Sequence, residues 1–381
     1  MTNFSLRSAL KCACALVLVA GCGPKDGLKE LAEAEAAFAV RDLVKADKAA
    51  AASLARAPEN PDALVLAVQV KLALGQISEA DALVKRAFAL AGGDADVLLL
   101  DAQCAYHGQD YDRAVGDYRK ILADASASAE LRAQALAGIG AVEMTRNEYV
   151  AARVALLQAI RLDRRNAAAR YHLGYLYRSS FGYLEAALEQ FEIYVRLEKQ
   201  DAERVRKVQR SMITDLREEI ASQAAHRPGA AKRDSAASAR ALAKAEAFAK
   251  PGPKQSWKSA RAAYQEAFSA DVLSYPAALG LAEATERTDT TPAGRAKALE
   301  AYKAACSLRP SSSKTLIKTG ELALQLGSPL IAVEAYSRAL AANPSDVSAV
   351  DGLIRSLRKA GGRAGEAAIY QNYRDSLGRK R

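Results

Sequence analysis

The chain has 381 residues, of which 50% are hydrophobic and 26% are charged, and its formal net charge is +10. This balance excludes a globally disordered chain, which would lack the apolar residues needed to form a core. Only 6% of the residues are aromatic, and the abundance of alanine and leucine favours helix over strand. The length corresponds to two or three domains.

Residues 1–21 are predicted to be a lipoprotein signal peptide. Arg7 and Lys11 give a positive start, and the apolar run CACALVLV at 12–19 follows them. That run is too short to span a bilayer, which takes about 20 residues. The sequence Val-Ala-Gly-Cys then ends at Cys22 and resembles the lipobox of bacterial lipoproteins. The resemblance implies cleavage after Gly21 and acylation of Cys22. An ordinary signal peptide cleaved at another bond stays an open alternative.

A cysteine with two or more acyl chains anchors a protein stably, so a membrane surface is one expected partner. Gly23, rather than an aspartate, follows Cys22. By resemblance to bacterial lipoproteins, a residue other than aspartate at this position implies sorting to the outer membrane. The expected location is therefore the cell envelope, with the lipid-anchored chain on the outer membrane and facing the periplasm. Residues 22–26 are expected to form the tether.

A repeating unit is clearest from Ser313 to Asp346. A small residue, Gly320, lies in its first helix, and Gly327 marks the turn. Tyr336 and flanking alanines follow in the second helix. The same ladder recurs in other segments. These are Gly27 to Asn60, Pro61 to Asp94, Ala95 to Ser128, Ala133 to Asn166, Ala167 onward with one residue inserted, two units around Trp257 and Tyr302, and a degenerate last copy from Val347.

The spacing has a physical reason. Apolar residues at i, i+3, i+4 and i+7 form one stripe on each helix. Small residues such as Gly140, Gly174 and Gly320 are placed where the paired helix must approach closely. A proline such as Pro344 stops the second helix.

The pattern resembles the tetratricopeptide repeat (TPR), over 27–201 and 239–381. The resemblance implies an all-α fold, a right-handed α-solenoid of about eight to nine helix-turn-helix units in two arrays. Neighbouring units would stack because a single helix pair cannot bury its apolar face. The first-helix tryptophan of the family consensus is replaced here by leucine or arginine, which affects the repeat boundaries and not the architecture.

The predicted domain order follows from these repeats. A first array (27–201) precedes an amphipathic capping helix (202–222). A linker (223–238) contains the Pro-Gly breaker at 228–229, and a second array (239–381) closes the chain.

No catalytic constellation stands out, so we expect no enzyme, no cofactor and no small-molecule substrate. The three histidines, His107, His172 and His226, lack a cysteine, glutamate or second histidine at metal-ligand spacing. Gly138 and Gly140 lack the third glycine and the preceding strand of a dinucleotide loop, which favours helix packing instead. Cys104 and Cys306 are expected to be small buried hydrophobic residues rather than a disulfide framework.

Binding is the function that the sequence favours. By resemblance, the first helices line a concave surface that takes a peptide or helix, and the candidate residues on it lie in the first array. They are Gln103, Tyr106, His107, Met144, Tyr171, Tyr175 and Arg178. Tyrosine and arginine are favoured interface anchors. Packing against neighbouring helices is the competing interpretation, especially for Tyr106. Trp257 is expected to belong to the core.

The expected function is a lipid-anchored envelope scaffold that assembles a pilus, secretion, outer-membrane or wall-synthesis complex. Its partners would be other envelope proteins. Two alternatives stay open: a regulator or recruiter of peptidoglycan enzymes, and a protein that binds anionic envelope polymers through basic faces. We expect no nucleic-acid partner for a secreted chain.

Overall fold

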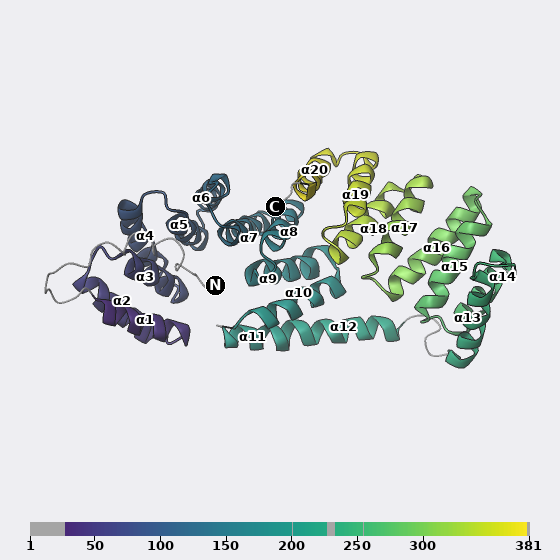
Figure 1. Cartoon of the computed structure of the whole chain (residues 1–381), viewed down its shortest axis with the longest axis horizontal. Helices are drawn as coiled ribbons and strands as arrows, with labels where there is room; N and C mark the ends of the chain where they lie inside the picture. The colour runs from purple at the N-terminus through teal and green to yellow at the C-terminus, as the bar shows by residue number, and fades with distance from the viewer. Residues whose placement is uncertain (1–26, 200, 227–232, 254, 379–381) are drawn as a thin grey trace. The chain divides into compact units, whose positions relative to one another are not determined.

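The computed structural model describes residues 27–199, 201–226, 233–253 and 255–378, and the regular structure in these ranges is helical (Figure 1). Successive helices form nine antiparallel pairs within these ranges, from α1–α2 to α9–α10 and from α13–α14 to α19–α20. The predicted all-α repeat fold is confirmed. The predicted signal peptide, Gly21, Cys22 and the tether all lie outside the described residues.

The chain forms two compact units, which are described separately. The first unit holds the described residues up to 176 together with 190–209. Its helices are α1 (Leu28–Ala39), α2 (Leu43–Arg56), α3 (Pro61–Ala73), α4 (Ile77–Ala91), α5 (Ala95–His107), α6 (Tyr111–Ala123), α7 (Ala129–Thr145), α8 (Tyr149–Leu162), α9 (Ala167–Leu176), the later part of α10 (Leu184–Leu197), and α11 (Ala202–Val208).

The second unit holds 177–189 and the described residues from 210 onward. Its helices are the π-helical turn η3 (Tyr177–Phe181), most of the π-helical turn η4 (Gln209–Ile213), α12 (Thr214–Ala225), α13 (Ser235–Ala249), α14 (Trp257–Ala270), α15 (Tyr275–Thr288), α16 (Pro292–Leu308), α17 (Ser313–Gln325), α18 (Pro329–Ala342), α19 (Val347–Ala360) and α20 (Ala364–Gly378).

Polar side chains begin many of these helices. The Asn60 carboxamide oxygen accepts from two backbone amides at the start of α3, where Pro61 takes the first helical position. The Asp346 carboxylate does the same for α19. These groups satisfy amide donors that have no partner within the helix. At the other end, α18 stops at Ala342, two residues before Pro344, as the repeat pattern predicts.

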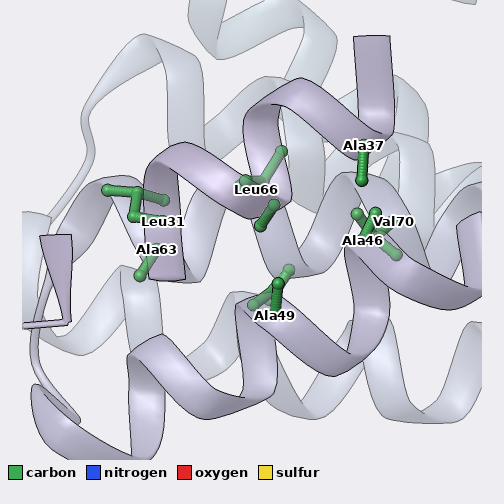
Figure 2. Packing of buried hydrophobic residues seen from close by; sticks show 10 residues of the cluster. Leu31, Ala37, Ala46, Ala49, Ala63, Leu66 and Val70 are labelled. Carbon is green, nitrogen blue, oxygen red and sulfur yellow. The ribbon is translucent and has the colours of Figure 1, made fainter. Parts of the chain in front are cut away.

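Alanine is the commonest residue of the core, and its small side chain lets the helices approach closely. Ala37, Ala46 and Val70 meet between α1, α2 and α3, and Leu31 with Ala63 extends the same layer (Figure 2). The methyl side chains fill these layers at low entropic cost. The apolar residues of this cluster therefore form thin interfaces between neighbouring helices.

Glycines mark the closest helix contacts. A Cβ atom added at Gly140 would lie 2.7 Å from Leu156, and one at Gly174 would lie 3.0 Å from Phe191. Gly138 faces the ring of Tyr118. The prediction that these glycines serve helix packing is confirmed.

The one-residue insertion in the fifth repeat appears as the π-helical turn η3. A π-turn accommodates one extra residue without ending a helix. The compact units divide at this turn, between Leu176 and Tyr177. The predicted boundary after residue 201 differs from this division because α10 contributes to both units.

The predicted capping segment is helical, with the π-helical turn η4 between α11 and α12. Helix α12 continues to Ala225 and α13 begins at Ser235, so the connection is shorter than the predicted linker. Cys104 and Cys306 are buried free thiols, as expected. The helices in the described ranges all fall short of the length or the hydropathy that a bilayer-spanning helix requires.

Candidate protein-binding surfaces

The predicted binding residues lie mainly on the first helix of each helix pair. We use the term first-helix surface for the side chains that these first helices carry outside the buried core of a unit. In the first unit, Gln103, Tyr106 and His107 lie on α5, Met144 lies on α7, and Tyr171 with Tyr175 lies on α9. The structure therefore places six of the seven predicted residues on first helices of one unit.

Tyr171 is the most enclosed member of this set in terms of ring contacts. Its ring lies 5.3 Å from that of Tyr194 and 6.0 Å from that of Phe191. The Arg204 guanidinium of α11 lies over it at 4.4 Å from the ring centroid. A guanidinium in this position is attracted by the π face. The Tyr171 ring therefore makes its contacts within the first unit. Helix α11 covers this ring, which the sequence predicts to be a binding anchor.

Helix α11 also contacts the first repeat. The Asp201 carboxylate, which begins α11 by accepting from the Arg204 amide at 2.9 Å, pairs with the Arg41 guanidinium at 3.1 Å. Arg41 lies in the turn between α1 and α2 with a φ of 62°. The first and last parts of this unit are therefore joined by an ion pair across 160 residues of sequence.

Tyr106 is also partly a packing residue. It packs against the buried cluster that includes Leu98 and Tyr118, and its ring lies 6.0 Å from that of Tyr111. Burial and the neighbouring Tyr111 raise the pKa of its hydroxyl. The adjacent His107 ring meets it edge-on at 5.3 Å.

The remaining members differ in exposure. Tyr175 is 46% exposed. Gln103 and Met144 are half-buried. Arg178 belongs to the second compact unit, where its guanidinium lies 3.8 Å from the Asp215 carboxylate.

The first-helix surface of the second unit is charged instead of aromatic. Across α15, α17 and α19 it carries Glu283, Glu286, Lys314, Lys318, Glu321, Arg355 and Arg358. Lys318 of α17 lies 3.7 Å from Glu286 of α15 and 3.1 Å from Glu321 of its own helix. Each ion pair at a solvated surface contributes little to the free energy of unfolding. These pairs therefore define the charge pattern of the surface and add little to the stability of the fold.

A cavity of about 440 Å³ lies on this surface, at α17, α18, α19 and α20. Its walls are Glu321, Tyr336, Ser348, Asp351, Ile354, Arg355, Arg358 and Gln371. Tyr336 belongs to α18, the second helix of its pair, and is only 1% exposed. Its ring lies between Gly320 and Gly352, which leave a slot because neither has a side chain.

The repeat spacing does not reveal this cavity, because it assigns Tyr336 only to helix packing. The available signal is the pair of glycines at 320 and 352 on either side of it. The basic pair Arg355 and Arg358, three residues apart in the last repeat, is the second signal. Within the described ranges, no group of three or more His, Cys, Asp or Glu side chains is arranged to hold a metal ion.

No family model matches the chain, and no curated protein matches it. Several solved structures have a similar arrangement of helices. The Cut9–Hcn1 hetero-tetramer of the APC/C is 14% identical, with coverage of 92% of this chain and 81% of that chain and a TM-score of 0.36.

A tetratricopeptide repeat protein from Parabacteroides merdae ATCC 43184 is 12% identical over 87% of this chain and 99% of its own, with a TM-score of 0.34. The TPR2AB domain of yeast Sti1 in complex with pHSP90 is 17% identical over 73% and 99%, with a TM-score of 0.28. The described helices of this chain form pairs that approach closely at glycine residues, as the repeat spacing predicts.

Proposed function

We propose that this tetratricopeptide-type solenoid is a protein-binding scaffold, held at a membrane of the cell envelope and acting by binding rather than by catalysis. The observation that carries the proposal is the first-helix surface of the second unit. It has a row of charged side chains and a cavity that the packing of the unit does not fill. Charged and polar groups arranged in this way give specificity to a protein interface.

The predicted tether adds the location. Acylation of Cys22 would leave a spacer of only a few residues before α1 begins at Leu28. The first repeat would then lie close to the membrane surface, facing the periplasm if the outer membrane is the site. A Cys22→Ser chain is expected to leave the membrane fraction, whereas a Cys306→Ser chain, altered at a buried thiol, is expected to stay in it.

The binding role is tested by crosslinking in intact cells. A photoreactive residue is placed at Ser348, which lines the cavity, and at Lys297, an exposed position on the second helix α16. We expect a discrete crosslinked envelope protein from position 348 and none from 297. Equal crosslinking at both positions, or none at either, would contradict the proposed surface.

The identity of the captured protein then distinguishes the possible assemblies. A structural component of a pilus, secretion pore or outer-membrane machine would indicate an assembly scaffold. A peptidoglycan enzyme would indicate a recruiter. In either case the purified complex is expected to form without turnover of any substrate by this chain.

A further inference from the structure

The end of helix α4 and the turn after it expose a run of residues without a polar side chain, Phe88 to Gly93. We call residues 88–93 the apolar run. Phe88 is 39% exposed and Leu90 is 46% exposed. The buried stripe of the helix ends before them, at Ala87. An exposed apolar patch of this kind marks a surface that contacts another molecule or a membrane.

The neighbouring repeats carry charged side chains at the place of Leu90. Helices α2, α4 and α6 begin at a constant spacing of 34 residues, so their ends correspond position by position. Leu90 corresponds to Arg56 at the end of α2 and to Asp124 directly after α6. The packing of the repeat therefore does not require an apolar side chain at position 90.

The apolar run lies at the edge of the first unit where the chain enters from the predicted tether. The Ser53 hydroxyl of α2 donates to the Gly27 carbonyl at 2.8 Å, which joins the entry point to the end of α2. The Arg86 guanidinium of α4 donates to the Pro58 carbonyl at 2.8 Å, which joins the end of α4 to the same edge. Leu28, the first residue of α1, is 58% exposed there. We call Leu28 and the apolar run together the apolar edge.

The predicted anchor would hold the apolar edge close to a bilayer. Gly27 follows Cys22 by five residues, and an extended chain of that length spans at most about 18 Å. The opposite edge of the first repeat, at the turn between α1 and α2, lies one helix length further from the anchor. For the 12 residues of α1 this length is about 18 Å. The apolar edge is therefore the part of the first repeat that the tether keeps nearest to lipid.

Charged side chains of both signs surround the apolar edge. The exposed ones are Lys29, Arg56, Glu59, Asp62, Lys85, Arg86 and Asp94. This mixture gives the edge no strong charge of one sign, so the burial of apolar area is the main interaction that it offers. A tethered chain also meets lipid at a high effective concentration, which lets a small apolar contact form.

We propose that the apolar edge lies in the interface of the lipid bilayer that carries the anchor, with Phe88, Leu90 and Leu28 in contact with the upper acyl chains. The proposal rests on the proposed membrane tethering and specifies which surface of the chain faces the membrane. The contact fixes the orientation of the first unit on its short tether, as an apolar interfacial surface does for other membrane-associated proteins.

The test uses the full chain, processed and acylated at Cys22, in vesicles of equal parts phosphatidylethanolamine and phosphatidylglycerol. An environment-sensitive fluorescent amino acid replaces Gly93, where a Cβ meets open space, or Val44, which is 77% exposed at the opposite edge. The vesicles contain a lipid with a nitroxide near the top of its acyl chain, which quenches fluorophores at short range. We expect at least about threefold stronger quenching at position 93 than at position 44.

A double variant removes apolar side chains from the edge without disturbing the repeat. Leu28→Gln together with Leu90→Gln is expected to lower the quenching at position 93 to the level at position 44. The fold should tolerate it, because both leucines are exposed and glutamine is a good helix former. Val44→Gln is the matched control and should leave the quenching at position 93 unchanged. Added salt should also leave it unchanged, because salt screens charges and not apolar burial.

Three results would overturn the proposal. Equal quenching at positions 93 and 44, or undiminished quenching in the double variant, would show that the apolar edge does not contact lipid. Loss of quenching in salt would mean that charges hold the edge at the membrane. A fluorophore at position 93 that is shielded from water but not quenched by the nitroxide lipid would assign the edge to a second copy or another protein.

Failure of the tethering has a different signature. If the Cys22→Ser chain stays in the membrane fraction as the unaltered chain does, the proposed anchor fails, whatever the apolar edge contacts. If only the Cys22→Ser chain leaves the membrane fraction and quenching is equal at positions 93 and 44, the anchor stands and the inference about the edge is wrong.

Discussion

The two compact units use the same helix pairs but treat their first-helix surfaces differently. In the first unit, helix α11 covers part of this surface: its Arg204 lies over the Tyr171 ring, and Asp201 at its start pairs with Arg41. In the second unit, the surface keeps a cavity with Arg355 and Arg358 on its wall. The comparison teaches that residue types favoured at interfaces do not mark a binding site when the chain supplies its own partner for them.

The largest expected effect concerns the glycine slot that distinguishes the second unit. Gly352→Ala places a Cβ 2.2 Å from the Tyr336 ring, so the ring or α19 must shift. We expect a loss of about 2–3 kcal/mol in the free energy of unfolding, measured by urea denaturation. Gly365→Ala on α20, where a Cβ meets open space, is the matched control and should not destabilise. If the two variants are equally stable, the Tyr336 ring is not confined between Gly320 and Gly352.

The closure of the first unit by α11 is tested at Asp201. Asp201→Ala removes both the helix cap and the ion pair to Arg41, and we expect a cost of about 1–2 kcal/mol with faster hydrogen exchange in α9 and α11. Asp234→Ala removes a cap of the same kind from α13 without an ion pair. If exchange in α9 is equally slow in both variants, α11 does not protect the Tyr171 surface.

The two matching tyrosines of the second unit should respond in opposite ways. Tyr302→Phe removes a hydrogen bond to Glu286 and is expected to cost about 1 kcal/mol of unfolding free energy. Tyr336→Phe removes a buried hydroxyl without an acceptor, so stability should stay the same or rise slightly. A loss of stability in Tyr336→Phe equal to that in Tyr302→Phe would mean that the hydroxyl already has an internal acceptor.

The smallest effect is a pH dependence that belongs to the first unit. Burial, together with Asp94 and Glu130, raises the pKa of Asp96 to about 6. Because the folded pKa lies above the ordinary value of 3.8, the unfolded chain loses this proton first. The contribution of Asp96 to stability is therefore lost as pH rises from about 4 to about 6.

Replacement of Asp96 by asparagine removes this titration. We expect Asp96→Asn to be more stable than the unaltered chain at pH 7 by about 1 kcal/mol, allowing for partial exposure to solvent. The two chains should converge below pH 4. A difference in unfolding free energy that does not change between pH 4 and pH 7 would contradict the raised pKa.

The sequence predicts the repeat architecture well because the periodic residues are also the packing residues. Gly140, Gly174 and Tyr336 are recognisable from their spacing, and each lies at a helix contact in the structure. The extra residue of the fifth repeat is also visible in the sequence, although its consequence, the π-helical turn η3, is not.

The binding surface is predicted less well, for a physical reason. Repeat register places Tyr171 on a first helix, but it does not reveal that Arg204, more than 30 residues later in the chain, lies over the Tyr171 ring. Likewise, the register assigns Tyr336 to the core without showing where its hydroxyl lies. Long-range contacts decide which outward-facing residues stay available, and a single repeat motif carries no information about them.

The central claim is that the second unit carries the working surface at the cavity that Arg355 and Arg358 line. The most direct measurement is the crosslinking yield from a photoreactive group at position 348 in intact cells. It is compared among the unaltered chain, the chain with Arg355→Gln and Arg358→Gln, and a control chain with Arg240→Gln, at an exposed arginine of α13. We expect a discrete partner in the unaltered chain and the control, and at least about a tenfold lower yield in the double variant. An undiminished yield in the double variant would contradict the claim.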